Sequence, residues 1–371
     1  MPQTKLSDKD KINALLNCQI VIQKKHIIME NLENQNVENQ NSINLNKKED
    51  QFQSRIDMIE LRASLEKVKA EIAKVIVGQE GMIEHLIAAL LSNGHVLIEG
   101  VPGVAKTITA KLLAKTIDVG FSRIQFTPDL MPSDILGTSV FSVKNSEFEF
   151  KKGPIFSSFI LIDEINRSPA KTQAALFEVM EERQITMDGI RYIMDEPFLV
   201  VATQNPIEHE GTYRLPEAQL DRFLFKINVG YPDLEQEIAI IRNQHESRKE
   251  DKTEGVNRVI TAGQLKSYQN LVKEIIVETQ LMEYIAKIIV NTRENQFLYL
   301  GASPRASLAL LTASKAFAAM RGRDFVTPED IKEASYAVLR HRVIVSPERE
   351  MEGLTADEII RQILEGIEIP R

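Results

Sequence analysis

The segment that most constrains this chain is a glycine-containing turn between an apolar run and a helical pattern. The turn is Gly100-Val101-Pro102-Gly103-Val104-Ala105-Lys106-Thr107; it follows the apolar run 95–99 and precedes apolar residues at helical spacing in 108–113. Glycine-rich backbone at a strand-to-helix junction can wrap its N–H groups around phosphate, and the helix N-terminus favours an anion. There Lys106 would neutralise phosphate oxygens and the Thr107 hydroxyl would reach a magnesium ion. The sequence therefore predicts a phosphate-binding loop.

One position departs from the usual pattern of such loops. The residue before the lysine is Ala105, where the pattern has glycine. Alanine is only one methyl group larger and is compatible with a helix start, so we expect the change to be tolerated. The residues predicted to surround the nucleotide phosphates are Gly100, Pro102, Gly103, Val104, Ala105, Lys106 and Thr107.

The rest of the chain predicts an α/β fold followed by helices. Apolar runs of strand length recur at 95–98, 158–162 and 198–202, separated by helical patterns, which is typical of a parallel sheet between helices. After Pro232 helical patterns dominate, with helix starts expected at Ser303-Pro304 and Thr327-Pro328. We predict a tail at 1–55, an α/β nucleotide-binding core at 56–232 and a smaller α-helical lid domain at 233–371.

The tail differs from the rest in composition. Residues 1–55 contain 16 Asn and Gln, one aromatic residue and no glycine, so they cannot bury enough apolar area to offset their ordering entropy. We therefore predict that this segment is disordered and is not a signal peptide. Both Met1 and Met29 are compatible with the start of the chain.

Charge and cysteine content narrow the function classes. The chain has 45 Lys and Arg against 53 Asp and Glu, a net charge of −8, which disfavours general binding to nucleic acid. Its single cysteine, Cys18, excludes a disulfide scaffold and fits a reducing, cytoplasmic location. We predict no transmembrane segment and no metal site built from the six scattered histidines.

Polar side chains follow two further apolar strands. Asp163 and Glu164 follow the run 158–162, where Asp163 can hold magnesium through water and Glu164 can polarise an attacking water. Asn205 follows the run 198–202 and can orient the same water. The alternatives are a solvated acidic turn and a turn-forming Asn-Pro step.

Two arginines complete the candidate site. Arg222 is either an exposed salt-bridging residue or a finger that stabilises transition-state charge on the nucleotide of a neighbouring subunit. Arg305 lies in the first turn of a predicted helix, where a cation opposes the helix dipole. We therefore expect an anion nearby, the γ-phosphate, and closure of the lid on the core through Arg305 when ATP binds.

Five ordered motifs together resemble the MoxR family of AAA+ ATPases. They are GVPGVAKT, LIDEINRSPAKTQAALFEVMEE, ATQNPIEHEGTYRLPEAQLDRF, LGASPRASLALL and VTPEDIKEASYAVLRHRV, and the resemblance runs from about Ile76 to the C-terminus. Alanine before the phosphate-loop lysine is usual in that family. The resemblance implies an AAA+ core with a helical lid, hydrolysing ATP with Mg²⁺.

The resemblance also implies roles for individual residues. Lys106 and Thr107 would belong to Walker A, Asp163 and Glu164 to Walker B, Asn205 would be sensor 1, and Arg222 an arginine finger acting in trans. The lid arginine Arg305 would be sensor 2, and Val77, Gly78 and Gln79 match the segment near the adenine base. Thr107 and Asp163 would hold the magnesium.

The family further implies a hexameric ring that remodels or activates client proteins, often with a separate partner protein carrying a von Willebrand factor A domain. Two predicted hairpins, around 144–146 and 188–190, match family insertions that face the pore or the partner. The alternatives are surface hairpins without a substrate-facing role, a nucleic-acid motor or loader, and a nucleotide-dependent switch. The first hairpin carries Lys144, Lys151 and Lys152 against Glu147 and Glu149, a charge that does not decide for or against nucleic acid. A switch would not require Glu164, Asn205 and Arg222 together.

Overall fold

The computed structural model describes residues 58–206, 213, 215–246 and 252–370. The tail predicted to be disordered, residues 1–55, lies outside the described residues. Residues 56–371 group into one compact unit, and the predicted boundary at residue 232 separates types of secondary structure within that unit.

A five-stranded parallel sheet forms the centre of this unit, in the order β10-β1-β9-β6-β3. The strand β9 lies between β1 and β6, so that Val201 pairs with Val96 on one side and with Leu161 on the other. The carboxyl ends of parallel strands meet at one edge of a sheet, which is where α/β proteins bind ligands. The strands are β1 (His95–Gly100), β3 (Phe121–Gln125), β6 (Phe159–Asp163), β9 (Leu199–Gln204) and β10 (Phe223–Val229).

Both faces of the sheet are buried, which confirms the predicted layering. Alternate residues of β1 point to opposite faces: Val96 and Ile98 belong to one hydrophobic cluster and Leu97 to the other. The first cluster includes residues of α2, α3 and α4, and the second includes residues of α5 and α6. These helices are α2 (Ile59–Ala73), α3 (Glu80–Leu91), α4 (Lys106–Thr116), α5 (Pro132–Leu136) and α6 (Ala170–Glu182).

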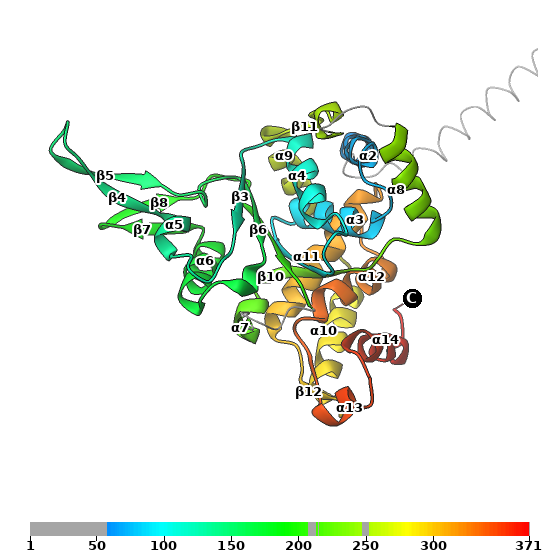
Figure 1. Cartoon of the computed structure of the whole chain (residues 1–371). Coiled ribbons are helices and arrows are strands. Elements are labelled where there is room, and N and C mark those ends of the chain that lie inside the picture. Colours follow the sequence, from blue (N-terminus) through cyan, green and yellow to red (C-terminus); the bar gives the residue numbers. More distant parts are fainter. Residues whose placement is uncertain (1–57, 207–212, 214, 247–251, 371) are drawn as a thin grey trace, which may run out of the picture. The chain divides into compact units, whose positions relative to one another are not determined.

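Two antiparallel hairpins extend from the sheet layer, as predicted (Figure 1). Phe150 of the first hairpin stacks on Tyr192 of the second, with ring centroids 4.7 Å apart. Large apolar side chains of the first hairpin remain exposed, including Val143 and Phe148. The hairpin strands are β4 (Gly137–Ser142) with β5 (Glu147–Lys152) and β7 (Gln184–Met187) with β8 (Ile190–Ile193).

The C-terminal part is mainly helical and packs directly on the sheet layer. Its helices α9, α10, α11, α12 and α14 contribute to the same hydrophobic cluster as α2, α3 and α4, and His85 of α3 stacks edge-on against both Phe225 of β10 and Phe317 of α11. The helices after residue 232 are α8 (Leu234–Glu246), α9 (Ala262–Glu274), α10 (Thr279–Glu294), α11 (Pro304–Met320), α12 (Pro328–Leu339), α13 (Pro347–Met351) and α14 (Ala356–Gly366), and the short helix α7 (Glu217–Leu220) precedes β10.

Short strands also occur after residue 232, where the sequence predicted helices alone. The pair β11 (Ile260–Thr261) and β2 (Ile117–Asp118) is parallel, and β12 (Leu298–Leu300) pairs with β13 (Ile344–Val345). Runs of two or three residues are too short to give a sequence period, so the pattern did not reveal them.

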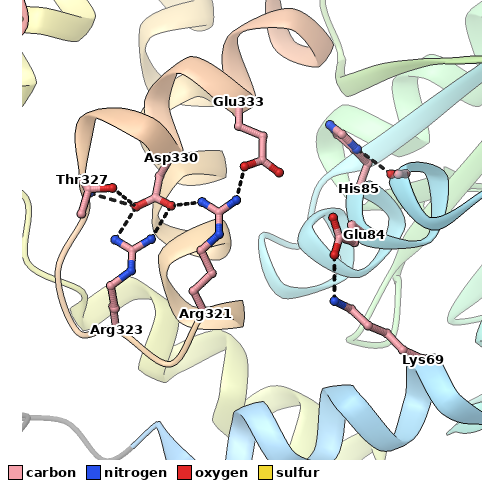
Figure 2. Close-up of polar contacts among 9 residues, drawn as sticks. Lys69, Glu84, His85, Arg321, Arg323, Thr327, Asp330 and Glu333 are labelled. Atoms are coloured by element: carbon pink, nitrogen blue, oxygen red, sulfur yellow. Dashed lines mark hydrogen bonds and ion pairs between the residues drawn. The ribbon is translucent and has the colours of Figure 1, made fainter.

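The predicted starts of α11 and α12 are confirmed, and α12 has a buried capping residue. Asp330 accepts hydrogen bonds from the backbone N–H and the hydroxyl of Thr327, and its carboxylate pairs with Arg321 and Arg323 (Figure 2). A fully buried carboxylate is tolerable only when it is paired in this way. Within the described residues, the helices are all too short or too polar to cross a membrane.

Candidate functional site

The turn between β1 and α4 requires its glycines. A Cβ on Gly100 would lie 2.6 Å from the carbonyl oxygen of Val229, and Gly103 has φ +87°. Ala105 also has positive φ, +62°, which is unfavourable for a residue with a side chain by about 1 kcal/mol. Strain of this kind concentrates at functional sites. Ala105 thus occupies a conformation that glycine would adopt more easily.

Lys106 links the ends of two adjacent strands. Its ammonium group donates to the carbonyl oxygen of Gly100 at the end of β1 and, at 3.3 Å, to that of Gln204 at the end of β9. The positive charge therefore lies over the turn, where it can neutralise phosphate oxygens.

Asp163, at the end of β6, is the centre of a buried polar group. Its Oδ1 accepts hydrogen bonds from the hydroxyls of Thr107 at 3.0 Å and Thr203 at 3.2 Å, and its Oδ2 pairs with Nε of Arg123 at 2.7 Å. Carboxylate and hydroxyl oxygens are the ligands that Mg²⁺ accepts in nucleotide sites. The donor set of Thr107 and Asp163 therefore fits this ion.

Glu164 is held at the same edge in an unusual backbone conformation. Its φ is +58°, and its backbone N–H donates to the Thr203 hydroxyl at 3.1 Å. Its Oε2 accepts a hydrogen bond from Nε2 of Gln125 at 2.9 Å and lies 3.1 Å from Nε of Arg167. These contacts direct a half-exposed carboxylate to the rim of the site, where it can reach solvent.

One cavity of about 750 Å³ brings most of the predicted residues together. Its lining includes Pro102, Gly103, Ala105, Lys106, Thr107, Asp163, Glu164 and Asn205. Gly100 and Val104 do not line it, since Gly100 lies against Val229 and the Val104 side chain is buried. The convergence follows from the strand order, because β9 brings Asn205 between the ends of β1 and β6.

Several residues that line this cavity were not predicted from the sequence, among them Lys111, Arg123, Gln125 and Thr203. Arg123 and Gln125 lie two apart on β3, so both project from the same face of the strand. The alternation of polar residues in 121–125 was the available signal, but the run is short and lacks the continuous apolar character of the other strands. Thr203 directly follows the apolar run 198–202 and was not singled out.

The two arginines lie elsewhere, and both contact Glu181 in the last turn of α6. Nη2 of Arg305 is 2.7 Å from Glu181 Oε1, and Nε of Arg222 is 3.9 Å from Glu181 Oε2. Neither arginine lines the cavity at the phosphate-binding turn. The carboxylate near Arg305 in this structure is that of Glu181, and the contact of Arg305 with the γ-phosphate when ATP binds stays a prediction.

The segment Val77-Gly78-Gln79 lies beside β10 instead of lining the phosphate cavity. Both Gly78 and Gln79 have positive φ, and the Gln79 amide donates to the carbonyl oxygen of Gly230 at 3.3 Å. Gln79 lines a second cavity of about 490 Å³ together with His85 of α3 and Tyr336 and Arg340 at the end of α12.

The described histidines with shifted pKa values serve packing. Burial lowers the pKa of His95 to about 3, and burial likewise lowers the pKa values of His85 and His341. Nδ1 of His95 accepts a hydrogen bond from the backbone N–H of Val200, and Nε2 lies 3.2 Å from the carbonyl oxygen of Met180. In the described part of the chain, no three His, Cys, Asp or Glu side chains form a cluster that could hold a metal ion.

Comparison with known families matches both parts of the fold. A profile of the ATPase family associated with various cellular activities (AAA) matches residues 95–225, and a profile of the AAA lid domain matches residues 290–363. The first match contains the phosphate-binding turn, Asp163, Glu164, Asn205 and Arg222, and the second contains Arg305.

Individual relatives are similar to this chain over most of its length. An uncharacterized protein of Bacillus subtilis, YeaC, is 44% identical over 84% of this chain and 96% of its own length. The chaperone MoxR1 of Mycobacterium tuberculosis is 43% identical over 83% of each chain. A crystal structure of a proposed ATPase from Cytophaga hutchinsonii has a TM-score of 0.78 at 42% identity and covers 89% of this chain and 100% of that one.

Proposed function

Since the chain belongs to the MoxR family of AAA+ ATPases, we propose that it hydrolyses ATP as an oligomer and uses the cycle to remodel or activate client proteins. The observation that supports hydrolysis is the single cavity at the sheet edge, which gathers Lys106, Asp163, Glu164 and Asn205. A protein that only bound nucleotide would need Lys106 and the magnesium ligand Asp163, but not Glu164 and Asn205.

Each residue of the cavity has a role in this proposal. The phosphates bind at the turn 100–107, where Lys106 neutralises their oxygens and the start of α4 provides backbone N–H groups. Thr107 and Asp163 would hold Mg²⁺, with Asp163 acting through water, and the ion when bound would offset phosphate charge. Glu164 accepts a proton from the attacking water, and Asn205 orients that water.

Gln125 is placed to position the base. Its amide donates to Glu164 Oε2, so this hydrogen bond fixes one carboxylate oxygen while Oε1 remains available to the water. The backbone segment 77–79 would lie near the adenine base, as the family resemblance implies.

Arg222 would act on the nucleotide of a neighbouring subunit. In its own subunit it contacts Glu181 and the carbonyl oxygen of Phe177, and it does not line the phosphate cavity. A cation is worth most in the transition state when it reaches the transferring phosphoryl group. Arg305 shares the counter-ion of Arg222, so we assign both arginines to the neighbour's nucleotide. The complete site then requires a ring, for which we propose six subunits.

The exposed hairpin favours protein as the client. Apolar side chains of β4–β5 are open to solvent, with Phe148 73% and Val143 85% exposed. Apolar exposed groups fit a protein segment better than a phosphate backbone, which needs cations. A separate protein with a von Willebrand factor A domain and a cytoplasmic location are part of the same proposal.

Steady-state hydrolysis measured against total protein concentration tests this function. The rate per subunit should rise with concentration as rings form, together with the particle mass measured by light scattering. Lys106→Ala should lose hydrolysis, whereas Lys67→Ala, an exposed lysine of α2, should behave as wild type. A rate no higher than that of Lys106→Ala, or a monomer under all nucleotide conditions, would contradict the proposal.

A further inference from the structure

Glu181 is the one acidic partner that the two arginines share among the described residues. It lies in the last turn of α6, its side chain is 39% exposed, and its two oxygens face different guanidinium groups, Oε1 facing Arg305 and Oε2 facing Arg222. Two cations therefore converge on one carboxylate. A cavity of about 180 Å³, lined by Glu181 and Arg222 but not by Arg305, gives an incoming group access to that pair.

The backbone behind these arginines is held firmly by a second carboxylate. Asp221 accepts hydrogen bonds from the hydroxyl of Ser303 at 3.1 Å and from Nε of Arg342 at 2.7 Å. Arg342 is buried and also donates to the carbonyl oxygen of Phe223. Asp221 precedes Arg222, and Ser303 is the N-cap residue of α11, the helix that carries Arg305. These hydrogen bonds hold the backbone next to Arg222 and Arg305 in place. The side chains of the two arginines can still change partner.

The ion pairs of Glu181 with Arg222 and Arg305 can be replaced by contacts with another anion. Ion pairs between half-exposed side chains contribute little, because water competes for both partners. A terminal phosphate carries more charge than a carboxylate and offers three oxygens to planar guanidinium groups. A phosphate brought close to this face would therefore displace Glu181 from both arginines.

We propose that Glu181 is a competing carboxylate that holds Arg222 and Arg305 within one subunit until the terminal phosphate of the neighbour's nucleotide replaces it. The inference rests on the proposed trans-acting role of the two arginines and adds a positioning residue to it. Glu181 lies three residues before the start of β7 at Gln184. Loss of its contacts with the two arginines would therefore occur next to the base of the β7–β8 hairpin.

The test uses ATP-dependent association in a background that cannot turn ATP over, Glu164→Gln. The ATP concentration for half-maximal association is measured by sedimentation velocity. Adding Glu181→Gln removes the competing charge while keeping the side-chain size, so this concentration should fall about threefold to tenfold, the range expected for two partly exposed ion pairs.

Two further variants separate this role from a general effect of removing charge or altering α6. Glu283→Gln removes an exposed carboxylate of α10 that does not line the cavity at Glu181 and Arg222, and it should leave the midpoint unchanged. When Arg222→Ala and Arg305→Ala are both present, adding Glu181→Gln should also have no effect. A midpoint that still falls in that background, or an increase instead of a decrease with Glu181→Gln, would overturn the competing role.

Failure of the inference can be told apart from failure of the proposed function. If wild-type hydrolysis rises with protein concentration and needs Arg222, but Glu181→Gln leaves the association midpoint unchanged, only the role of Glu181 is wrong. If ATP drives no association and hydrolysis does not need Arg222, both proposals are wrong. Melting temperatures of all variants show whether α6 remains folded.

Discussion

Two carboxylates organise two separate regions of this molecule, and they differ in burial. Asp163 is almost fully buried at the end of β6 and holds Thr107, Thr203 and Arg123, whereas Glu181 is half-exposed and holds Arg222 and Arg305. A buried carboxylate cannot lose its partners without a large desolvation penalty, but an exposed one can exchange them for water or another anion. The phosphate cavity is thus built in advance, while the arginine face is poised to change partner.

The largest effect on hydrolysis is expected at Arg222, one of the two arginines that contact Glu181. Arg222→Ala should lower kcat for ATP by about 10³-fold or more, the size of effect that an arginine finger has on phosphoryl transfer. Steady-state hydrolysis measures it, and Arg361→Ala, an exposed arginine of α14, is the control.

A mixing experiment shows whether Arg222 acts between subunits. Arg222→Ala subunits should recover part of their activity when mixed with Lys106→Ala subunits, since some interfaces then combine an intact arginine with an intact phosphate turn. Absence of recovery in rings shown to be mixed would place Arg222 in its own subunit's site. The phosphate cavity and the two arginines would then belong to one site within a single subunit.

In the phosphate cavity, Glu164→Gln should lower hydrolysis by about 10²- to 10⁴-fold, because it removes the general base. Binding of a fluorescent ATP analogue should remain at the wild-type level, since Lys106 and the turn are unchanged. Turnover equal to wild type would exclude Glu164 as the base, and loss of nucleotide binding would show that it supports the cavity instead.

The stability of the protein should be sensitive to acid through His95, at the start of β1. His95 contacts the carbonyl oxygen of Met180, next to Glu181, and burial lowers its pKa to about 3 against 6.5 in the unfolded chain. Below pH 6.5 the unfolded chain binds a proton that the folded chain does not, so stability falls as pH falls. At pH 5 His95 should reduce the free energy of unfolding by about 2 kcal/mol.

Urea unfolding at pH 7.5 and pH 5.0 measures this loss. His95→Gln cannot titrate at this position, so its stability should change less between the two pH values than that of the wild type, while the buried His341 contributes equally in both proteins. An equal pH dependence of stability in the two proteins would show that the buried His95 side chain is not held neutral in the folded protein.

The smallest effect concerns strain in the phosphate turn. Ala105→Gly should raise the free energy of unfolding by up to about 1 kcal/mol, because glycine adopts positive φ without steric cost. Ala110→Gly, in the interior of α4, should instead destabilise by about 1 kcal/mol. Urea midpoints distinguish the two, and equal destabilisation would show that the turn is not strained at Ala105.

The cavity was predictable because its residues lie at the ends of apolar strands. Asp163, Glu164 and Asn205 each stand within three residues of a run that the sequence marks as buried strand, and parallel strands present their carboxyl ends at one edge. Gln125 and Arg123 were missed since β3 is short and polar on one face. Their role depends on pairing with β6, which no local pattern encodes.

The sequence by itself determined the layered α/β fold, the phosphate turn, the helix starts at Pro304 and Pro328 and the two hairpins, because each depends on neighbouring residues and their spacing. Only the tertiary structure decided that β9 separates β1 from β6 and that Arg305 joins Arg222 on Glu181. Those arrangements depend on how distant segments pack, since Ser303 and Asp221 must meet across 82 residues before α11 can face the end of α6.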